Sequence, residues 1–520
     1  MSLLFWIGLV LNAVTLWYVL RYNMHMFQLN TYMNNEQRVW LSRNWKKEGV
    51  LILLAVLGLL TSLTNSVVAA VLYCLLAGFV LYYFRFLKRY HTKITLKFTT
   101  RTKRMIATDL VLCAVALGLT LWLAGPRWMW LACGLLILGQ MVLLMAANVI
   151  NQPMEKAVKQ HYIDDAMRLL AEKPDMKIIG ITGSYGKTSV KHYLYTLLRQ
   201  HFDVLITPGN FNTPMGVVIT VREHLRPKHQ IFLCEMGARY VGEIKEICDI
   251  AHPDMGIITS IGPQHLDTFG SIENVTKTKF ELADALPEGG LILLNGDNEY
   301  IRENSGKYKD KVFFSTDGGE EGYTATDIKV SSAGTTFTIH APSGESCAFR
   351  TRLVGKHNVI NITGAIACAH ILGVPLEELR IPVQKLQPVS HRMEMSERGG
   401  ATIIDDSYNS NPIGSKAAVE TLALFEGTRI LITPGMVELG EDEERYNYLL
   451  GTYAADCCDY IALVGKKHTE PILKGILDKG FPESKVQVFR RVEDAMAYAN
   501  KLNTRDHKYI LIENDLPDNY

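Results

Sequence analysis

The sequence predicts a three-part chain, in which an all-α transmembrane region precedes an α/β domain and a second, Rossmann-like α/β domain. Three observations support this fold class. Residues 1–150 are largely apolar, whereas residues 151–520 have the mixed composition of a globular protein. From Lys177 onward, short apolar strands alternate with helical segments, and a second alternation begins near Arg398. Such alternation is typical of parallel sheets with helices on both faces.

We divide the 520 residues into four segments. Residues 1–150 are the transmembrane region of about five helices, and residues 151–175 are an amphipathic connecting helix. Residues 176–388 are the central domain, and residues 389–520 are the C-terminal domain. A chain of this length is long enough for about three domains.

Five apolar stretches in the first segment are candidates to cross a bilayer, which takes about 20 apolar residues. The first could instead be a signal peptide, but it lacks a basic start and a small-residue cleavage site. Asp109 and Gln140 are the polar residues near or within spans, and we interpret them as helix contacts. The candidate spans are Leu3–Leu20, Val50–Leu63, Val67–Phe84, Ile106–Ala124 and Trp128–Ile150.

The cations between these stretches predict the orientation. Most cations lie in two loops, between spans one and two and between spans three and four. The turns between spans two and three and between spans four and five carry only one cation, Arg127. By the positive-inside rule, the N-terminus lies outside the cell membrane, while both basic loops and everything after Ile150 lie in the cytoplasm. Those loops could also contact anionic lipid headgroups. The cations are Arg21, Arg38, Arg43, Lys46 and Lys47 between spans one and two, and Arg85, Lys88, Arg89, Lys93, Lys97, Arg101, Lys103 and Arg104 between spans three and four.

Charge and cysteine content exclude two classes of site. The net charge of +1 gives no bulk attraction to nucleic acid. The nine cysteines show no metal-binding spacing, and Cys457 and Cys458 are adjacent, so we interpret them as reduced thiols.

The segment from Gly180 to Thr188 is typical of the end of a strand, a glycine loop and the start of a helix. Backbone N–H groups of Gly183, Ser184, Gly186 and Ser189 could surround phosphate oxygens at such a helix start. Lys187 adds a charge for the outer phosphates, and the Thr188 hydroxyl can hold Mg²⁺. Ile181 stands where the strict motif has its first glycine. The segment predicts binding of a nucleoside triphosphate.

Side chains at neighbouring strand ends suit phosphoryl chemistry. Glu235 ends an apolar strand and could hold Mg²⁺, although a solvated strand-end acid is the simpler alternative. His265 follows a second strand and is a candidate metal ligand. Lys279, 14 residues further on, would by itself be a surface lysine.

The later part of the chain adds further candidates. Asp405 and Asp406 follow the first strand of the C-terminal domain and suit ribose hydroxyls or a cation, or form an ordinary turn. His357 or Asn358 could cap a helix. Arg392 lies at the domain boundary, where it could reach a phosphate as domains close.

Taken together, these motifs resemble the Mur ligase family, and within it the MurF branch, which adds D-alanyl-D-alanine to a cell-wall precursor. They occur in family order over residues 176–440, which is far more specific than any single run. The matching runs are Gly180–Ser189, Thr207–Thr213, Glu235–Ala238, Gly262–Leu266, Thr278–Glu281, Leu294–Asp297, Gly355–Asn361, His391–Glu394, Asp405–Pro412 and Gly435–Gly440.

The resemblance implies ATP-dependent amide formation, in which a substrate carboxylate becomes an acyl phosphate and an amine then attacks it. It implies two Mg²⁺ ions, held by Thr188, Glu235, His265 and a carbamylated Lys279. Lys187 would hold phosphate, and Asn210 would lie near the acyl phosphate. Asn295, Asn358 and Asn361 would face the base, while Arg392 and Asp406 would contact phosphate and ribose.

Two departures from the family leave the substrates open. The transmembrane region stands where related enzymes have a soluble domain for the substrate's uridine nucleotide. The segment Tyr509–Tyr520 lacks the Lys-Gly-Ser run that the branch carries near the incoming amine. The carboxylate substrate could be lipid-linked, and the amine could be an amino acid or a dipeptide.

Three functions remain open from the sequence. The leading one is a membrane-anchored, MurF-like ligase that acts on a cell-envelope precursor. A second is a ligase of the poly-γ-glutamate type. A third is a nucleotide-gated transporter or sensor, which the scarcity of ionisable residues in the spans disfavours.

Overall fold

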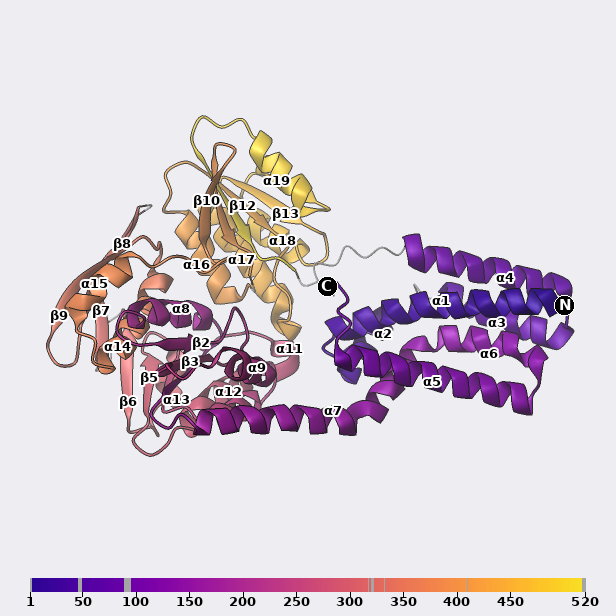
Figure 1. The fold of residues 1–520 in the computed structure, drawn as a ribbon. Coiled ribbons are helices and arrows are strands. Elements are labelled where there is room, and N and C mark those ends of the chain that lie inside the picture. The colour runs from indigo at the N-terminus through magenta and orange to yellow at the C-terminus, as the bar shows by residue number, and fades with distance from the viewer. Residues whose placement is uncertain are drawn as a thin grey trace. The chain divides into compact units, whose positions relative to one another are not determined.

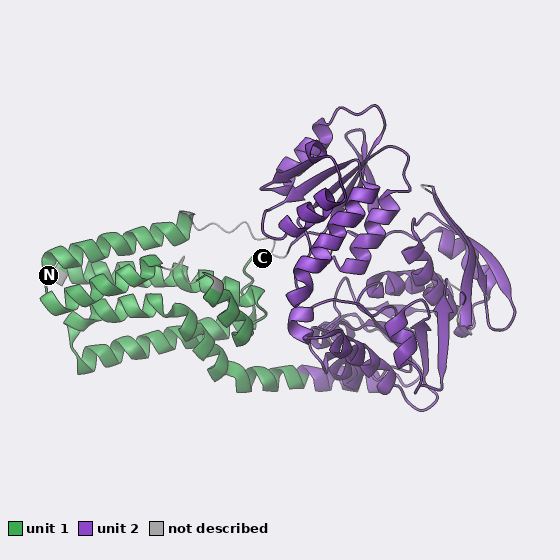
Figure 2. Cartoon of the chain, turned by 180° about the vertical axis from the view of Figure 1, so that it is seen from behind, with its two compact units in different colours: residues 1–161, 517–520 green, residues 162–516 purple. Residues whose placement is uncertain are grey.

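The computed structural model describes residues 2–44, 49–87, 95–316, 318, 322–331, 333–408 and 410–516. The chain separates into two compact units, which divide between His161 and Tyr162 (Figure 2). The predicted loop cations Lys46, Lys47, Lys88, Arg89 and Lys93 lie outside the described residues.

The first unit is helical throughout its described part (Figure 1). Hydroxyl groups start two of its helices, because Ser66 and Thr99 accept hydrogen bonds from the backbone N–H groups of Ala69 and Thr102. Its elements are α1 (Ser2–Leu29), α2 (Asn34–Asn44), α3 (Gly49–Thr64), α4 (Val67–Tyr82), η2 (Tyr83–Leu87), α5 (Thr100–Leu123), η3 (Pro126–Trp128), α6 (Met129–Leu138) and the first part of α7 (Gln140–Ala171).

The described residues contain fewer helices that could cross a membrane than the five spans predicted from the sequence. By length and composition, three described helices could cross a membrane: α1, α4 with the residues after it, and α5. The predicted fifth span is a pair, α6 and α7, that is bent by 71° and could count as a fourth. The predicted span Val50–Leu63 is α3, whose 16 residues fall short of the roughly 20 needed.

The predicted connecting helix is not a separate element. Helix α7 runs without a break from Gln140 to Ala171, past the predicted boundary at Ile150 and past Pro153. The break lies earlier, at Gly139, between α6 and α7. The last part of α7 contributes Ile163, Ala166 and Leu170 to a hydrophobic core of the second unit.

Polar side chains inside the first unit pair with one another. Gln140 Nε2 donates to Asp109 Oδ2 at 2.7 Å, and Tyr73 OH donates to Asn12 Oδ1 at 2.8 Å. These contacts join different helices, which agrees with the interpretation of Asp109 and Gln140 as helix contacts.

The second unit contains two sheets. The nine-stranded sheet and its helices are called the first lobe here. Neighbouring strands from β2 to β7 in the spatial order pair in parallel, whereas β8 pairs antiparallel with both of its neighbours, β7 and β9. The order is β2 (Val204–Ile206), β3 (Ile231–Glu235), β1 (Lys177–Thr182), β4 (Met255–Ile258), β5 (Leu291–Asn295), β6 (Lys311–Ser315), β7 (Gly322–Ser331), β8 (Gly334–His340) and β9 (Ser346–Thr351).

Successive side chains of each strand point to opposite faces of this sheet, and helices bury both faces. Ile179 and Ile181 of β1 belong to one core, with α8, α14 and α15, whereas Ile178 belongs to the opposite core, with α7, α9, α10 and α12. The helices are α8 (Lys187–Leu198), α9 (Pro214–His224), α10 (Glu243–Ala251), α11 (Leu266–Phe269), α12 (Ile272–Asp284), α13 (Glu299–Asn304), α14 (Lys356–Ile371) and α15 (Leu376–Gln384).

The six-stranded sheet and its helices are called the second lobe. Only its edge pair β10–β11 is antiparallel among the described strands. Its cores lie on both faces, one with α16, α17 and α18 and the other with α19. The order is β10 (Glu394–Arg398), β11 (Ala401–Asp406), β15 (Lys508–Glu513), β12 (Thr428–Thr433), β13 (Tyr460–Val464) and β14 (Val486–Phe489); the helices are α16 (Pro412–Leu422), η4 (Gly440–Asp442), α17 (Glu443–Cys457), α18 (Glu470–Asp478), η5 (Glu483–Lys485) and α19 (Val492–Lys501).

Candidate functional site

The glycine loop lies at the carboxyl end of β1 and leads directly into α8. Gly183 and Gly186 have φ of 151° and 84°, which L side chains rarely adopt. A Cβ on Gly186 would stand 2.6 Å from Asn361 Oδ1, so the loop approaches α14 as closely as a glycine allows. The sequence prediction of strand, glycine loop and helix is therefore correct in its geometry.

Lys187 folds back over this loop. Its Nζ donates to the carbonyl oxygens of Gly183 at 2.6 Å and Ser184 at 3.3 Å. Burial lowers the pKa of Lys187 to about 8, with Glu235 opposing the shift and Arg392 adding to it. Two charged groups from different parts of the chain, Glu235 and Arg392, therefore act on this one amine.

Glu235 is fully buried at the end of β3 and carries three contacts. Its Oε1 accepts hydrogen bonds from Thr188 Oγ1 at 3.0 Å and from Asn212 Nδ2 at 3.1 Å. Its Oε2 forms an ion pair with Lys191 Nζ at 2.8 Å, without the alignment of a hydrogen bond. Burial by itself would raise the pKa of Glu235, but Lys191 and Lys187 outweigh it and the pKa is lowered. Glu235 is therefore not a solvated acid at the end of a strand, which was the simpler alternative from the sequence.

Lys191 was not predicted as a site residue. It lies one helical turn after Lys187 and is fully buried. Besides Glu235, its Nζ reaches the carbonyl oxygens of Thr207 at 2.8 Å and Gly209 at 2.7 Å. The i+4 spacing from Lys187 was the only signal in the sequence.

His265 lies at the start of α11 and faces the second lobe. Its Nδ1 contacts Glu438 Oε2, and Arg239 Nη2 contacts Glu438 Oε1. Burial lowers the pKa of His265, with Glu438 opposing and Arg239 and Lys279 adding to the shift. For Glu438, burial would raise the pKa, but His265 and Arg239 hold it at about 2. Glu438 is the second residue that the sequence analysis did not single out.

Lys279 is buried on α12, with 1% of its surface exposed. This overturns its interpretation as a surface lysine. Among the described residues it has no hydrogen bond or ion pair, and its closest aromatic contact is the Phe269 ring, 6.0 Å from Nζ. Burial, followed by the charge of Lys187, lowers the pKa of Lys279 well below its usual value.

A cavity of about 40 Å³ adjoins the loop. Its lining contains Asn210, whose Nδ2 donates to Tyr408 OH of the second lobe at 2.7 Å. The predicted residues that line it are Ser184, Gly186, Lys187, Thr188, Asn210, Glu235 and Arg392.

A second cavity, of about 110 Å³, shares Gly186 and Arg392 with the first. Asn295 Nδ2 donates to Thr259 O at 2.7 Å, and Asn358 Oδ1 accepts from Tyr193 OH at 2.8 Å. The predicted residues that line it are Gly186, Ser189, Asn295, Asn358, Asn361, Arg392 and Asp406.

The second lobe contributes a carboxyl pair to this cavity. Asp406 and Glu513 stand opposite each other on β11 and β15, and both line the cavity. Burial raises the pKa of Asp406 to about 6, against the charge of Arg392. Glu513 was not predicted, because it lies 107 residues from Asp406 and only the strand pairing brings the two together.

Gly183 and Asp405 line neither cavity, and the same holds for two further predicted residues, His265 and Lys279. The latter two are linked to the cavity residues through charge, because Lys187 acts on Lys279 and Lys279 acts on His265. The described residues contain no group of three His, Cys, Asp or Glu side chains that could hold a metal ion. A carboxylate and a hydroxyl do meet beside the loop, where Thr188 Oγ1 donates to Glu235 Oε1 at 3.0 Å.

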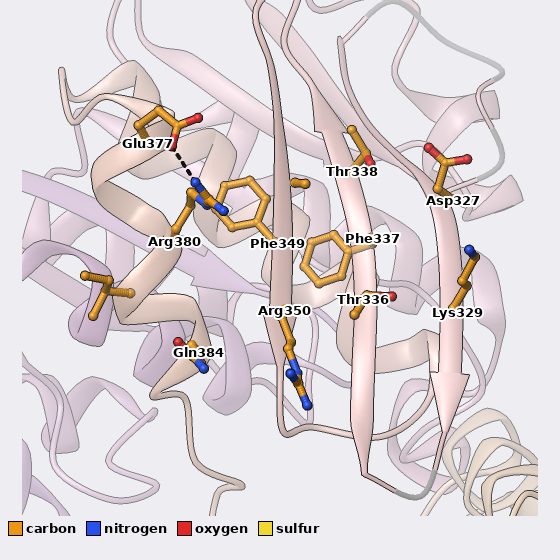
Figure 3. A pocket seen from close by; sticks show the side chains of 12 residues that line it. Asp327, Lys329, Thr336, Phe337, Thr338, Phe349, Arg350, Glu377, Arg380 and Gln384 are labelled. Carbon is orange, nitrogen blue, oxygen red and sulfur yellow. Dashed lines mark hydrogen bonds and ion pairs between the residues drawn. The ribbon is translucent and has the colours of Figure 1, made fainter.

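A larger hollow of about 640 Å³ lies elsewhere, between β7–β9 and α15 (Figure 3). Its lining includes the ion pair Arg380–Glu377 and none of the predicted site residues. We therefore place the candidate site at the two smaller cavities.

Comparisons with known proteins assign most of the second unit to one protein family. Residues 181–369 match the model of the Mur ligase middle domain, and residues 391–513 match the Mur ligase, glutamate ligase domain. Both cavities are lined by residues from these two matched segments. Residues 1–180 lie outside both matches.

Curated relatives match about two thirds of the chain. UDP-N-acetylmuramoyl-tripeptide–D-alanyl-D-alanine ligase of Escherichia coli is 32% identical over 334 residues, 62% of this chain and 73% of that protein. The enzyme of the same name from Bacillus subtilis is 31% identical over 369 residues, 69% of this chain and 78% of that protein. A crystal structure of MurF from Acinetobacter baumannii has a TM-score of 0.62 at 27% identity, covering 69% of this chain and 77% of that one.

Proposed function

Because the chain belongs to the Mur ligase family and is a MurF-like, ATP-dependent ligase, we propose that the two cavities hold ATP between the lobes. There a substrate carboxylate would be phosphorylated and then joined to an amine. Phosphorylation converts a poor electrophile into one with a good leaving group. The product is an amide bond, and ADP and phosphate are released.

One observation carries the assignment of residues. Thr188 on the glycine loop and Glu235 on the neighbouring strand meet at 3.0 Å, beside Lys187 and opposite Arg392 of the other lobe. A hydroxyl and a carboxylate next to a phosphate loop are the groups that Mg²⁺ takes when it also binds phosphate oxygens. Lys187 and Arg392 would place positive charge on both sides of the transferred phosphate.

The remaining roles follow from position. Asn295, Asn358 and Asn361 would face the base in the second cavity, and Asp406 would contact the ribose. Asn210, held by Tyr408, would lie near the acyl phosphate. Gly183, Ser184, Gly186 and Ser189 would present backbone N–H groups to the phosphates.

The donor set fits a divalent cation at Thr188 and Glu235. A second ion, at His265 and Lys279, would require carbamylation of Lys279. When bound, Mg²⁺ would neutralise charge as phosphate and carboxylate oxygens approach each other. The protein's own part is to orient these oxygens and to exclude water from the closed cavities.

The relatives' names suggest the substrates. We propose a D-alanyl-D-alanine dipeptide, or a related amino-acid amine, as the nucleophile and a muramoyl peptide as the carboxylate. Because residues 1–180 lie outside the matched domains and contain apolar helices, we also propose that the chain is a multi-pass protein of the cell membrane. Its lobes would face the cytoplasm, and the carboxylate could be lipid-linked.

The test uses the full chain in detergent with ATP, Mg²⁺ and one amine at a time, with phosphate release and product mass as readouts. We expect turnover with a D-alanine dipeptide and a muramoyl tripeptide, and its loss in Lys187→Ala. Lys277→Ala is the control, because Lys277 is an exposed lysine on α12. Turnover only with glutamate would favour the poly-γ-glutamate reaction, and phosphate release without any amide product would favour a gated transporter or sensor.

The carrier of the carboxylate is tested in the same assay. The tripeptide is supplied either on a soluble uridine nucleotide or on an undecaprenyl lipid in mixed micelles. Equal rates with both would remove the support for a lipid-linked substrate.

A further inference from the structure

Two acidic side chains lie next to each other at one edge of the sheet in the second lobe. Asp406 and Glu513 are the last residues of β11 and β15, and they are paired in the parallel ladder between these strands. Neighbouring strands lie about 4.7–4.9 Å apart, and paired positions of parallel strands present their side chains to the same face. Both residues line the cavity of about 110 Å³. The fold therefore brings two carboxyl groups together beside the space proposed for the nucleotide.

The hydrogen bonds of this pair leave one carboxyl oxygen without a donor. Asp406 Oδ1 accepts a hydrogen bond from Met393 N at 3.1 Å. Glu513 is fully buried, and its Oε1 accepts a hydrogen bond from Ser410 Oγ at 2.5 Å. Its Oε2 is buried as well but accepts no hydrogen bond from the described residues. Because buried polar atoms are rarely left unpaired, this oxygen requires another kind of partner.

A proton on Glu513 Oε2 provides that partner, because a protonated carboxyl group is a donor. Burial raises the pKa of Glu513 well above its usual value, and the neighbouring charge of Asp406 adds to the shift. Burial also raises the pKa of Asp406, to about 6, although the charge of Arg392 opposes it. Two carboxyl groups that share one site do not both ionise readily. Near neutral pH, Asp406 is therefore the anion and Glu513 the neutral acid.

We propose that Glu513 is a positioning residue for Asp406, to which it donates a hydrogen bond as a neutral acid, so that the pair presents one fixed negative charge to the nucleotide. This inference rests on the proposed function, in which Asp406 contacts the ribose. The Asp406 carboxylate accepts a hydrogen bond from a ribose hydroxyl, while Glu513 and the backbone N–H of Met393 hold it in place. Loss of the shared proton adds a second negative charge beside an anionic ligand and removes the donor that holds Asp406. Nucleotide binding should therefore weaken at high pH.

The other titratable groups around the pair do not account for such a change. Among the residues that line the cavity, burial raises the pKa of Tyr185 to about 12 and lowers that of His357 to about 4. Burial would raise the pKa of Asp405, beside Asp406, but hydrogen bonds from Ser407 and His391 outweigh it and the pKa is lowered.

The remaining neighbours are of types that ordinarily change charge outside the range of about pH 7–9. Helix α16, which packs on β15, contributes only uncharged side chains to the cavity. The charged or titratable residues that line the cavity or lie beside the pair in the sheet or the sequence are, besides those just described, Arg392, Tyr408, Glu394 and Asp515. Within that range of pH, the shared proton of the pair is thus the change in charge that we expect at the cavity.

The test compares Glu513→Gln and Glu513→Ala with a matched control. Glutamine keeps a neutral donor for Asp406 and an acceptor for Ser410, whereas alanine keeps neither. Glu443→Gln is the control, because Glu443 lies in the same lobe and pairs with His468 at 2.6 Å but lines neither cavity. The affinity of the full chain in detergent for a non-hydrolysable ATP analogue with Mg²⁺ is measured by calorimetry over about pH 7–9, the range in which buried carboxyl groups of this kind ionise. Infrared difference spectra between the unmodified chain and Glu513→Gln report, without nucleotide, the carbonyl band of a protonated carboxylic acid.

In the unmodified chain, the affinity should fall about tenfold or more over this range, because only the pair with one proton binds the nucleotide well. Glu513→Gln should keep the affinity near neutral pH to within about threefold and should not show the fall at high pH. Glu513→Ala should bind about tenfold more weakly already near neutral pH, because Asp406 has lost its donor. Glu443→Gln should follow the unmodified chain. The infrared band should be present in the unmodified chain near neutral pH and absent from Glu513→Gln.

A parallel fall of affinity in the unmodified chain and in Glu513→Gln would assign the pH dependence to another group and overturn the proposal, as would an affinity of the unmodified chain that does not change with pH. If Glu513→Gln binds as weakly as Glu513→Ala near neutral pH, Glu513 acts as an ionised acceptor and the proposal is wrong. Absence of nucleotide binding at every pH would instead refute the proposed function, and the infrared band would still decide whether Glu513 carries a proton. Thermal unfolding of each variant confirms that it is folded before these comparisons are made.

Discussion

Replacing Lys191 by methionine should destabilise the first lobe more than any removal of a surface charge. Lys191 and Glu235 are both fully buried and 2.8 Å apart, and the same amine reaches Thr207 O and Gly209 O. The methionine side chain would fill a similar volume but would leave Glu235 as a buried carboxylate without its cation. Breaking a buried ion pair by removing one partner costs about 3–5 kcal/mol.

The loss is measured as hydrogen exchange of the slowest amides of α8 and β3. A cost of about 3–5 kcal/mol corresponds to roughly 10²- to 5 × 10³-fold faster exchange, if these amides exchange through opening of the lobe. Lys245→Met is the control, because Lys245 and Asp249 pair at 2.6 Å while both side chains are more than half exposed. Such a pair contributes about 0–1 kcal/mol.

A double variant distinguishes the destabilisation due to the unpaired Glu235 charge from the destabilisation due to lost packing. Lys191→Met combined with Glu235→Gln removes both charges, so it should exchange more slowly than Lys191→Met alone. The reasoning is refuted if Lys191→Met changes exchange no more than Lys245→Met does. It is also refuted if the double variant is destabilised by the full sum of the two single changes.

Three other predictions concern the candidate site. In Gly186→Ala the new Cβ would stand 2.6 Å from Asn361 Oδ1 at a φ of 84°, so binding of a fluorescent ATP analogue should weaken at least tenfold. Burial raises the pKa of Asp406 from 3.8 to about 6, so its favourable contribution is present at low pH and is lost as the pH rises through about 6; the thermal midpoint of the unmodified chain should fall relative to Asp406→Asn between those values. With ¹³C-bicarbonate, the chain should show a carbamate resonance that Lys279→Met lacks and Lys277→Met keeps.

The sequence predicts the first lobe well because its signals are local. The alternation of strands and helices expected from Lys177 onward begins with β1, Lys177–Thr182, an apolar run bounded by a polar turn and a glycine loop. The period-two alternation of residues in Tyr323–Thr351 corresponds to the antiparallel strands β7, β8 and β9. In both cases hydrophobic period and turn residues lie within a few residues of each other.

Contacts between distant residues could not be predicted in this way. His265 and Glu438 are 173 residues apart, and Asn210 and Tyr408 are 198 apart. A single sequence contains no signal that pairs such positions, because the pairing depends on how the lobes meet. Helix α7 differs from the prediction in another way, because it runs unbroken from Gln140 to Ala171, past the boundary at Ile150 that was predicted between the last span and the connecting helix.

The electrostatics of the site support the proposal that Lys279 is carbamylated. His265 and Lys279 contribute only nitrogen, and the positive charges of Lys187 and Arg239 lie near them. Magnesium prefers oxygen ligands and negative charge, so these two side chains do not form a site for it as they stand. Burial lowers the pKa of Lys279 and favours the neutral amine, which is the form that attacks carbon dioxide. Carbamylation would place two oxygens and a negative charge on Lys279 itself, next to the positive charge of Lys187, and this supports the proposal that the lysine is modified.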